Sequence, residues 1–321
     1  MKKKEYASGC PVSFRTSIGG QALIEGVMMR GPEKTAIAVR TPDGQITVEP
    51  LDDSRLRKLP RWTQWPVLRG IMTFIQSLFL GYKAILRSAE LSGAEEQQEP
   101  SKLDRFLTEK LGEKGFAVVG IVGGVLGVAL AVCLFVFVPT FLVGQFNRHV
   151  FSLGAATSVA EGLIKIAVFI AYLALVSLLP DIRRTFEYHG AEHKSIACYE
   201  AGRELTAENA AGFTRFHPRC GTSFILIILI LSIVLFLAVP ANWGILWRFL
   251  LRILMLPVIV GLGYEIIKYV GRHDNFFTRA LSAPGLWLQR LTTREPDAHQ
   301  LEVALASLKA VCPEDKEQAQ W

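Results

Sequence analysis

The 321-residue sequence has only five cysteines, scattered along the chain at Cys10, Cys133, Cys198, Cys220 and Cys312. This is not the dense, paired pattern that cross-links small secreted domains, so we expect a reduced, cytosol-facing compartment. No apolar run follows the three lysines after Met1 within the first sixty residues. We therefore expect no cleaved signal peptide and predict that the chain is inserted through an internal span.

Basic patches interleaved with aromatic residues are also missing outside the apolar stretches. The net charge of +6 is therefore better explained by the basic flanks of membrane spans than by nucleic-acid binding. Half of the residues are hydrophobic, yet a fifth are charged. Apolar residues must be concentrated in some stretches and absent from others, which is typical of membrane spans joined by soluble parts.

Residues 1–60 are predicted to form a small cytoplasmic β unit. Two runs, residues 35–40 and 45–49, are β-branched or alternating and flank a Pro42-Asp43-Gly44 turn, which predicts a hairpin. Before it, residues 19–31 are rich in glycine. Such glycines let a backbone approach a ligand, but a strand that ends in a tight turn is the preferred interpretation.

Residues 61–93 are predicted to contain an amphipathic helix, because polar residues between positions 67 and 87 fall roughly on one stripe. This helix is expected to lie in the membrane interface or to pack on the soluble part, although its length also allows a span. The next residues, 94–115, combine a polar, acidic run with a short helix. We interpret them as a linker.

Four further stretches are apolar and long enough to cross about 30 Å of hydrocarbon at about 1.5 Å per helical residue. They are residues 116–144, 163–179, 222–239 and 249–264. The predicted fold class is a mainly α membrane protein with about four transmembrane helices, a small N-terminal β unit and cytoplasmic helices. The spans hold no convincing set of charges, which argues against a transport path.

Basic residues predict the orientation of these spans. Residues 181–221 contain six of them, namely Arg183, Arg184, Lys194, Arg203, Arg215 and Arg219. The loops on the other side hold far fewer, so residues 181–221 are predicted to face the cytoplasm of a bacterial inner membrane, together with both termini. Residues 268–321 then form a cytoplasmic segment, in which Leu301, Ala304, Leu305 and Leu308 mark the packing face of a helix.

The run His189-Gly-Ala-Glu-His193 lies in the predicted cytoplasmic loop. On a helix, His189 and His193 project from one face and can bind one metal ion, while Glu192 acts as a base. This is the H-x-x-E-H arrangement of inverted zincins. A histidine pair at this spacing is also common as ordinary surface or packing histidines, and Glu200 is either a reserve ligand or a solvated helix charge.

A third ligand is needed, and the sequence offers two sources. Glu265 lies at the cytoplasmic end of the last predicted span, where a carboxylate is costly unless it is ligated or paired with Lys268 or Arg272. The alternative is His217 with Cys220, in the spacing and chemistry that suit zinc. Three ligands leave an open, catalytic position, whereas His189, His193, His217 and Cys220 together make a closed structural site. Both remain open at this point.

Four motifs resemble the YqhQ family of bacterial membrane proteins in the same order along nearly the whole chain. They are residues 17–32 (SIGGQALIEGVMMRGP), 189–194 (HGAEHK), 217–224 (HPRCGTSF) and 284–296 (PGLWLQRLTTREP). The resemblance is weakest in the linker and the spans. It implies an uncharacterised membrane protein of a family predicted to contain metal-dependent enzymes, and it adds no substrate.

The sequence therefore favours a metal-dependent enzyme at the cytoplasmic membrane face, a hydrolase with a divalent metal, zinc by its ligands, and Glu192 as proton acceptor. Nearby arginines suit a phosphorylated or lipid-headgroup substrate drawn from membrane lipid, and a membrane-proximal peptide is the other option. No nucleic-acid partner is expected. The alternative function is a non-enzymatic membrane scaffold or transport component with a structural metal or none.

Overall fold

The computed structural model describes residues 14–54, 60–94, 113–151, 153–237, 239, 243, 245–273 and 275–313. The chain divides into two compact units, which are considered separately. Unit 1 comprises Met1–Ala94, Leu173–Ile228 and Pro257–Trp321, and unit 2 comprises Glu95–Tyr172 and Leu229–Leu256.

Unit 1 contains a four-stranded antiparallel sheet in the order β1-β2-β3-β4. Its strands are β1 (Gly19–Leu23), β2 (Gly26–Arg30), β3 (Thr35–Arg40) and β4 (Ile46–Pro50). The hairpin predicted around the Pro42-Asp43-Gly44 turn is confirmed, with Arg40 opposite Ile46 and Gly44 at a φ of 83°. The glycine-rich segment forms a second hairpin, β1–β2, rather than a single strand and turn.

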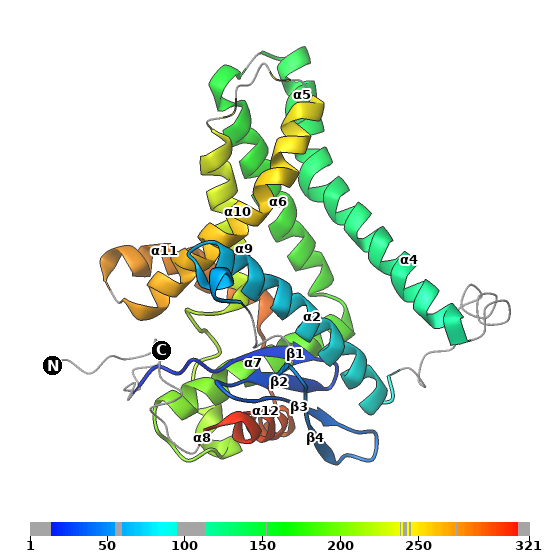
Figure 1. Ribbon diagram of the computed structural model, residues 1–321, viewed down its shortest axis with the longest axis vertical. Coiled ribbons are helices and arrows are strands. Elements are labelled where there is room, and N and C mark those ends of the chain that lie inside the picture. Colours follow the sequence, from blue (N-terminus) through cyan, green and yellow to red (C-terminus); the bar gives the residue numbers. More distant parts are fainter. Residues whose placement is uncertain are drawn as a thin grey trace. The chain divides into compact units, whose positions relative to one another are not determined.

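Helices cover both faces of this sheet (Figure 1). On one face, Leu80 and Ala84 of α2 (Leu68–Leu91) pack against apolar side chains of β1, β2 and β3. On the other, α7 (Pro180–Glu200) and α12 (Ala298–Val311) pack against the alternate residues of β2 and β3. The predicted helix at residues 67–87 is therefore present, and it packs on the sheet. It is not among the helices that meet the length and hydropathy of a span.

The C-terminal helix was also predicted correctly in its packing face. Asp297 caps α12 in a reciprocal pair with Gln300, and Leu301, Ala304, Leu305 and Leu308 are all buried. The remaining elements of unit 1 are the 3-10 helix η1 (Arg61–Gln64), α8 (Ala207–Ala211) and α11 (Phe276–Thr292). The sequence had not indicated α11, which begins at an Asn275 capping box.

The apolar helices begin with α4 (Glu113–Val132), a π-helical segment at Cys133–Phe137 and α5 (Val138–His149). They continue with the 3-10 helix η3 (Gly154–Ala156), α6 (Thr157–Val176), α9 (Gly221–Phe236) and α10 (Ile245–Arg272). The predicted linker at 94–115 lies outside the described residues except at its two ends.

Among the described residues, three helical stretches are long and apolar enough to cross a membrane, at Val122–His149, Thr157–Val176 and Phe249–Arg272. They correspond to the first, second and fourth predicted spans. The third, expected at 222–239, is α9 with 16 residues. Its length of about 24 Å falls short of a hydrocarbon core of about 30 Å, so the structure supports three spans by length and not four.

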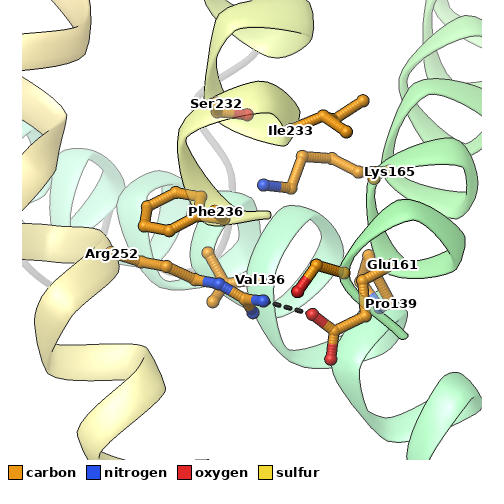
Figure 2. A pocket seen from close by; sticks show the side chains of 10 residues that line it. Val136, Pro139, Glu161, Lys165, Ser232, Ile233, Phe236 and Arg252 are labelled. Carbon is orange, nitrogen blue, oxygen red and sulfur yellow. Dashed lines mark hydrogen bonds and ion pairs between the residues drawn. The ribbon is translucent and has the colours of Figure 1, made fainter. Parts of the chain in front are cut away.

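Unit 2 contains charged side chains that the sequence had not shown as a set. Arg252 on α10 pairs with Glu161 on α6 (Figure 2). Its guanidinium also donates to the Thr140 hydroxyl at 2.7 Å. Lys165, one helical turn after Glu161, lines the same small cavity. Glu161 and Lys165 are neighbours on α6, but Arg252 lies 91 positions after Glu161, and only the packing of the helices adds it to them.

Candidate metal centre

The histidine pair lies on α7, as predicted. Pro180 occupies the first turn of this helix, where a missing N–H costs nothing, and the helix continues to Glu200 without a break. His189 and His193 are therefore one turn apart on the same face, with ring centroids separated by 4.5 Å. His193 is buried, and His189 is half-buried.

Each ring of the pair is oriented by a backbone carbonyl. Nδ1 of His189 lies 2.8 Å from the Thr292 carbonyl oxygen, and Nδ1 of His193 lies 2.5 Å from that of Arg215. A carbonyl only accepts, so both Nδ1 atoms carry a proton, and Nε2 is the ring atom that each histidine can offer to a metal ion. Histidines that ligate metals through Nε2 are held in this way by their other nitrogen.

Gly190 explains how the Thr292 carbonyl reaches its histidine. A Cβ at position 190 would lie 2.0 Å from the carbonyl oxygen of Arg294, so only glycine lets the segment after α11 pass this close to α7. The same segment is fixed by the Arg294 N–H, which donates to the Phe186 carbonyl at 2.8 Å. The glycine of the HGAEH run therefore serves the orientation of His189.

Cys220 completes the group from the turn that precedes α9. Its Sγ lies 3.2 Å from Nε2 of His189, and one ligand atom from each of His189, His193 and Cys220 lies within 4.8 Å of the others. Cys220 is buried, at 6% exposure. Two imidazole nitrogens and one thiol sulfur form the donor set that zinc prefers, so these residues fit a bound zinc ion.

The thiol and the imidazoles stabilise each other's charged forms. Burial alone would raise the pKa of Cys220, but the adjacent His189 and His193 outweigh it and hold that pKa well below its usual value. Burial likewise lowers the pKa of His189, but the Cys220 sulfur outweighs it and raises that pKa to about 9. The sulfur is thus disposed to be a thiolate, the form in which cysteine binds metals.

Glu192 lies beside the group on the same helix and is 5% exposed. Burial raises the pKa of its carboxyl group above the usual value, although His193, His189 and the Gly20 amide lower it. Gly20 of β1 allows this approach, because a Cβ there would lie 2.8 Å from Cγ of Glu192. The glycine-rich segment thus admits a side chain of the site rather than a ligand directly.

The group opens on a cavity of about 510 Å³, a size typical of sites for small ligands. Its walls come from residues 17–22, from α7, from the turn before α9 and from the first turns of that helix. His189, His193, Glu192 and Cys220 all line it. His217 lines it as well, so the predicted catalytic residue and four of the five predicted ligands face one space.

His217 is adjacent to the group but held differently. Its ring lies 5.5 Å from that of His193, and the guanidinium of Arg219 donates to its Nε2 at 3.3 Å. Burial and the charge of Arg219 lower the pKa of His217 well below its usual value, which keeps the ring neutral. Because a cation already uses the ring nitrogen, His217 is not a member of the three-residue group.

Glu200 is neither a solvated charge nor a neighbour of the metal group. It is completely buried, pairs with Arg219, and accepts the Thr16 N–H at 2.7 Å. Burial raises the pKa of its carboxyl group, and Arg219 opposes this. The pair joins the chain before β1 to the turn that carries Cys220, since Arg219 also donates to the Thr16 carbonyl at 2.7 Å.

The structure does not bring Glu265 to the histidines. Its carboxylate forms a two-point ion pair with Arg69 of α2, and Nε of that arginine lies 2.6 Å away. It also accepts the Val67 N–H at 3.4 Å. The sequence had offered Lys268 or Arg272 as the alternative partner, and it missed Arg69 because that residue lies 196 positions earlier.

Other residues that shape the site were also missed. Gln289 of α11 accepts the His217 N–H at 2.8 Å and donates to the His217 carbonyl at 2.7 Å, which fixes the turn before Cys220. The Thr292 carbonyl comes from the same helix. The available clue was that Gln289 follows Leu288 and Thr292 follows Leu291, so that two polar residues one turn apart adjoin an apolar stripe and must find partners inside.

Comparisons with known proteins agree with the motifs. A family model described as "Protein of unknown function (DUF1385)" matches residues 65–314. The chain is 36% identical over 291 residues to the "Uncharacterized protein YqhQ" of Bacillus subtilis (strain 168), covering 90% of each chain. No solved structure matches.

Proposed function

The chain belongs to the YqhQ family, and on that premise we propose from its own residues that it is a metal-dependent membrane enzyme, a hydrolase. The observation that carries the proposal is the shared orientation of His189 and His193, whose Nε2 atoms and the Cys220 sulfur converge beside Glu192 at a cavity. With both Nδ1 atoms held by carbonyls, the three potential ligand atoms face one another rather than separate partners.

His189, His193 and Cys220 would hold a zinc ion. Three protein ligands leave one coordination position open, which distinguishes catalytic from structural zinc sites. When bound, the metal supplies Lewis-acid activation of water and polarisation of the substrate. The arrangement favours the open site over the closed one that includes His217, because Arg219 occupies that ring.

Glu192 would move the proton. In its ionised form the carboxylate accepts a proton from the attacking water, and the protonated carboxyl then donates it to the leaving group as the scissile bond breaks. Burial favours this exchange, since it raises the pKa of Glu192 towards the working range of a general base. The cavity confines the substrate next to that carboxyl group.

The proposal includes a membrane location with the site and both termini in the cytoplasm, which requires α9 to cross as a fourth, short span beside the three long ones. Its support is the three apolar helices and the six basic residues at 181–221. Reporter fusions after Arg203 and after Trp321 should both report cytoplasm, and one after Ser152 the opposite side. A periplasmic report from Arg203 would contradict the orientation, and one from Trp321 alone would show that α9 does not cross.

Metal content and function are measured together on purified protein and in a deletion strain of the parent organism. The wild-type chain should carry about one zinc ion, and His193→Ala should lose both zinc and complementation. Glu192→Gln should keep zinc and lose complementation, because that side chain is a base and not a ligand. The control is His299→Ala, at an exposed histidine of α12, which should keep both.

Two results would contradict the proposal. Full complementation by Glu192→Gln with zinc retained would remove the hydrolytic mechanism. A wild-type chain without any transition metal after gentle purification would favour the scaffold or transport function instead.

A further inference from the structure

Two helices of unit 1 expose apolar faces. On the outward side, the exposed aromatic residues are Trp62 of η1, Trp65 directly after it, and Phe79 and Tyr82 of α2. Helix α11 exposes Phe276, Phe277 and Trp287. Phe276 is 89% exposed, and the others are between half and two-thirds exposed. We call these seven residues the aromatic rim. Large aromatic side chains in such numbers are costly in water but favourable at the headgroup level of a bilayer.

The inward sides of the same helices build the metal centre. On α11, Gln289 holds the His217 backbone and Thr292 orients His189. On α2, Gly81 packs against Gln21 of β1, and Gln21 lines the cavity. Because a helix is only about 10–12 Å across, the rim residues within one turn of Gly81 or Gln289, namely Phe79, Tyr82 and Trp287, lie about one helix diameter from the elements that line the cavity.

The rim is continuous with a candidate span. The stretch Phe249–Arg272 ends four residues before α11 begins at Phe276, and α11 turns away from α10 there (Figure 1). The first turn of α2 packs on the same helix, where a Cβ at Gly70 would lie 2.9 Å from the Gly261 carbonyl oxygen. One turn after Gly261 on α10, Glu265 forms its ion pair with Arg69 of α2. At this point the sequence of α10 changes from apolar to charged residues. This places both helices at the boundary of the hydrocarbon core.

The cavity is sized and placed for part of an amphiphile. The residues that line it include Thr222 and Ile225 on the first turns of apolar α9, and Ile225 is 43% exposed. A volume of about 510 Å³ admits a headgroup but not a folded domain or a whole lipid.

We infer that α2 and α11 lie in the membrane interface through the aromatic rim, and that the substrate of the metal centre is a membrane amphiphile whose polar headgroup enters the cavity while its apolar chains remain in the bilayer. The part on the substrate rests on the proposed function. The part on the interface does not.

Location is tested with full-length chains in vesicles of phosphatidylcholine and phosphatidylglycerol. One variant keeps only Trp287 and another only Trp65, with phenylalanine at the other tryptophans. The control has no native tryptophan and carries Asp43→Trp in the exposed β3–β4 turn. Lipids brominated near the headgroup end of their chains should quench Trp65 and Trp287 at least about twofold and leave the control unchanged. Quenching equal to that of the control would overturn the interface assignment.

A second measurement needs no substitution, in case the variants unfold. A membrane-partitioned carbene reagent applied to the wild-type chain should label peptides of α11 and α2 and spare α12, which packs against both the sheet and α7. Labelling of α11 and α2 no greater than that of α12 would overturn the assignment equally.

Substrate class is tested with a photoreactive phenylalanine at Phe186, whose side chain lines the cavity. Irradiated in cells, it should acquire the mass of a lipid without a shift to a protein-sized band. The same residue at Val128 of α4, which is 66% exposed in a candidate span, controls for lipid labelling, and one at Asp43 controls for solvent.

A protein-sized adduct at Phe186 would overturn the proposal that the substrate is an amphiphile. So would the absence of any adduct at Phe186 when the Val128 variant does acquire lipid. Neither result bears on zinc content or on Glu192→Gln, so failure of the substrate class is distinguishable from failure of the proposed function. Conversely, a lipid adduct on a chain that holds no metal would show amphiphile entry without the metal centre.

Discussion

Each unit buries a small group of ionisable side chains, but the two groups are built in opposite ways. In unit 2, Glu161 and Arg252 satisfy each other, and the cavity beside them holds about 10 Å³, room for one water molecule (Figure 2). In unit 1, backbone carbonyls hold the Nδ1 atoms of His189 and His193, and the Nε2 atoms lie towards Cys220 at a large cavity. Charges that pair with each other hold helices together, whereas side chains oriented by backbone carbonyls keep their other polar atoms available to a ligand.

The largest effect should come from removing a ligand of the unit 1 group. Cys220→Ser should reduce bound zinc from about one ion per chain to less than about a tenth, because a thiolate ligand is lost. Arg252→Met, in the unit 2 group, should leave zinc unchanged. Elemental analysis of both purified variants measures this. Equal zinc loss in the two would mean that the contrast between the groups is false.

Substitutions in the unit 2 group should change the free energy of unfolding rather than the zinc content. Glu161→Gln leaves Arg252 and Lys165 as two cations without a counter-charge, which should cost about 3–5 kcal/mol of unfolding free energy. Arg252→Met leaves Glu161 with Lys165 one turn away as a replacement partner. It should therefore cost clearly less. Thermal unfolding in detergent compares them, and equal losses would show that Lys165 takes no part.

A matched pair of glycines tests the approach of β1 to Glu192. Gly20→Ala places a methyl group 2.8 Å from Glu192 Cγ and from the Met28 carbonyl oxygen, which should cost about 1–3 kcal/mol and impair complementation with zinc retained. Gly19→Ala meets nothing within 4 Å and should behave as wild type. Impairment of both variants to the same degree would point to a general effect of alanine in this strand.

The smallest effect is expected at Glu265. Glu265→Gln removes a partly exposed ion pair with Arg69, which should cost about 1 kcal/mol or less, and zinc content should not change. Unfolding midpoints and elemental analysis measure both quantities. Loss of zinc would return Glu265 to the ligand set.

Local patterns predicted much of this molecule. The Pro42-Asp43-Gly44 turn, the helix of the HGAEH run and the buried face of α12 all follow from residue spacing, since each depends on neighbours within a turn or two. Helix α11 was missed because Pro284 and a mixed surface obscure its period. The third predicted span, residues 222–239, was overestimated in length because hydropathy alone does not fix where a helix ends.

Within the site, the sequence grouped His189, Glu192 and His193, which lie on one turn, and offered Cys220 among several options. It could not choose between Cys220 and Glu265, because that choice depends on how α2, α9 and α11 pack. Carbonyl partners such as Thr292 and Arg215 leave no trace in side-chain type. The Glu161–Arg252 pair was missed for the same reason, since it joins residues 91 positions apart.

The distance along the chain between the parts of the metal centre also sets the order of its assembly. His189 meets the Thr292 carbonyl across 103 residues, and Thr16 meets Glu200 across 184. Such long-range contacts form late, after shorter loops have closed. The histidines are synthesised well before α10 and α11, so during translation they pass through a stage without their orienting carbonyl. If the proposed zinc is bound, its uptake would be a last step of biogenesis, and a chain arrested before α11 would remain without metal.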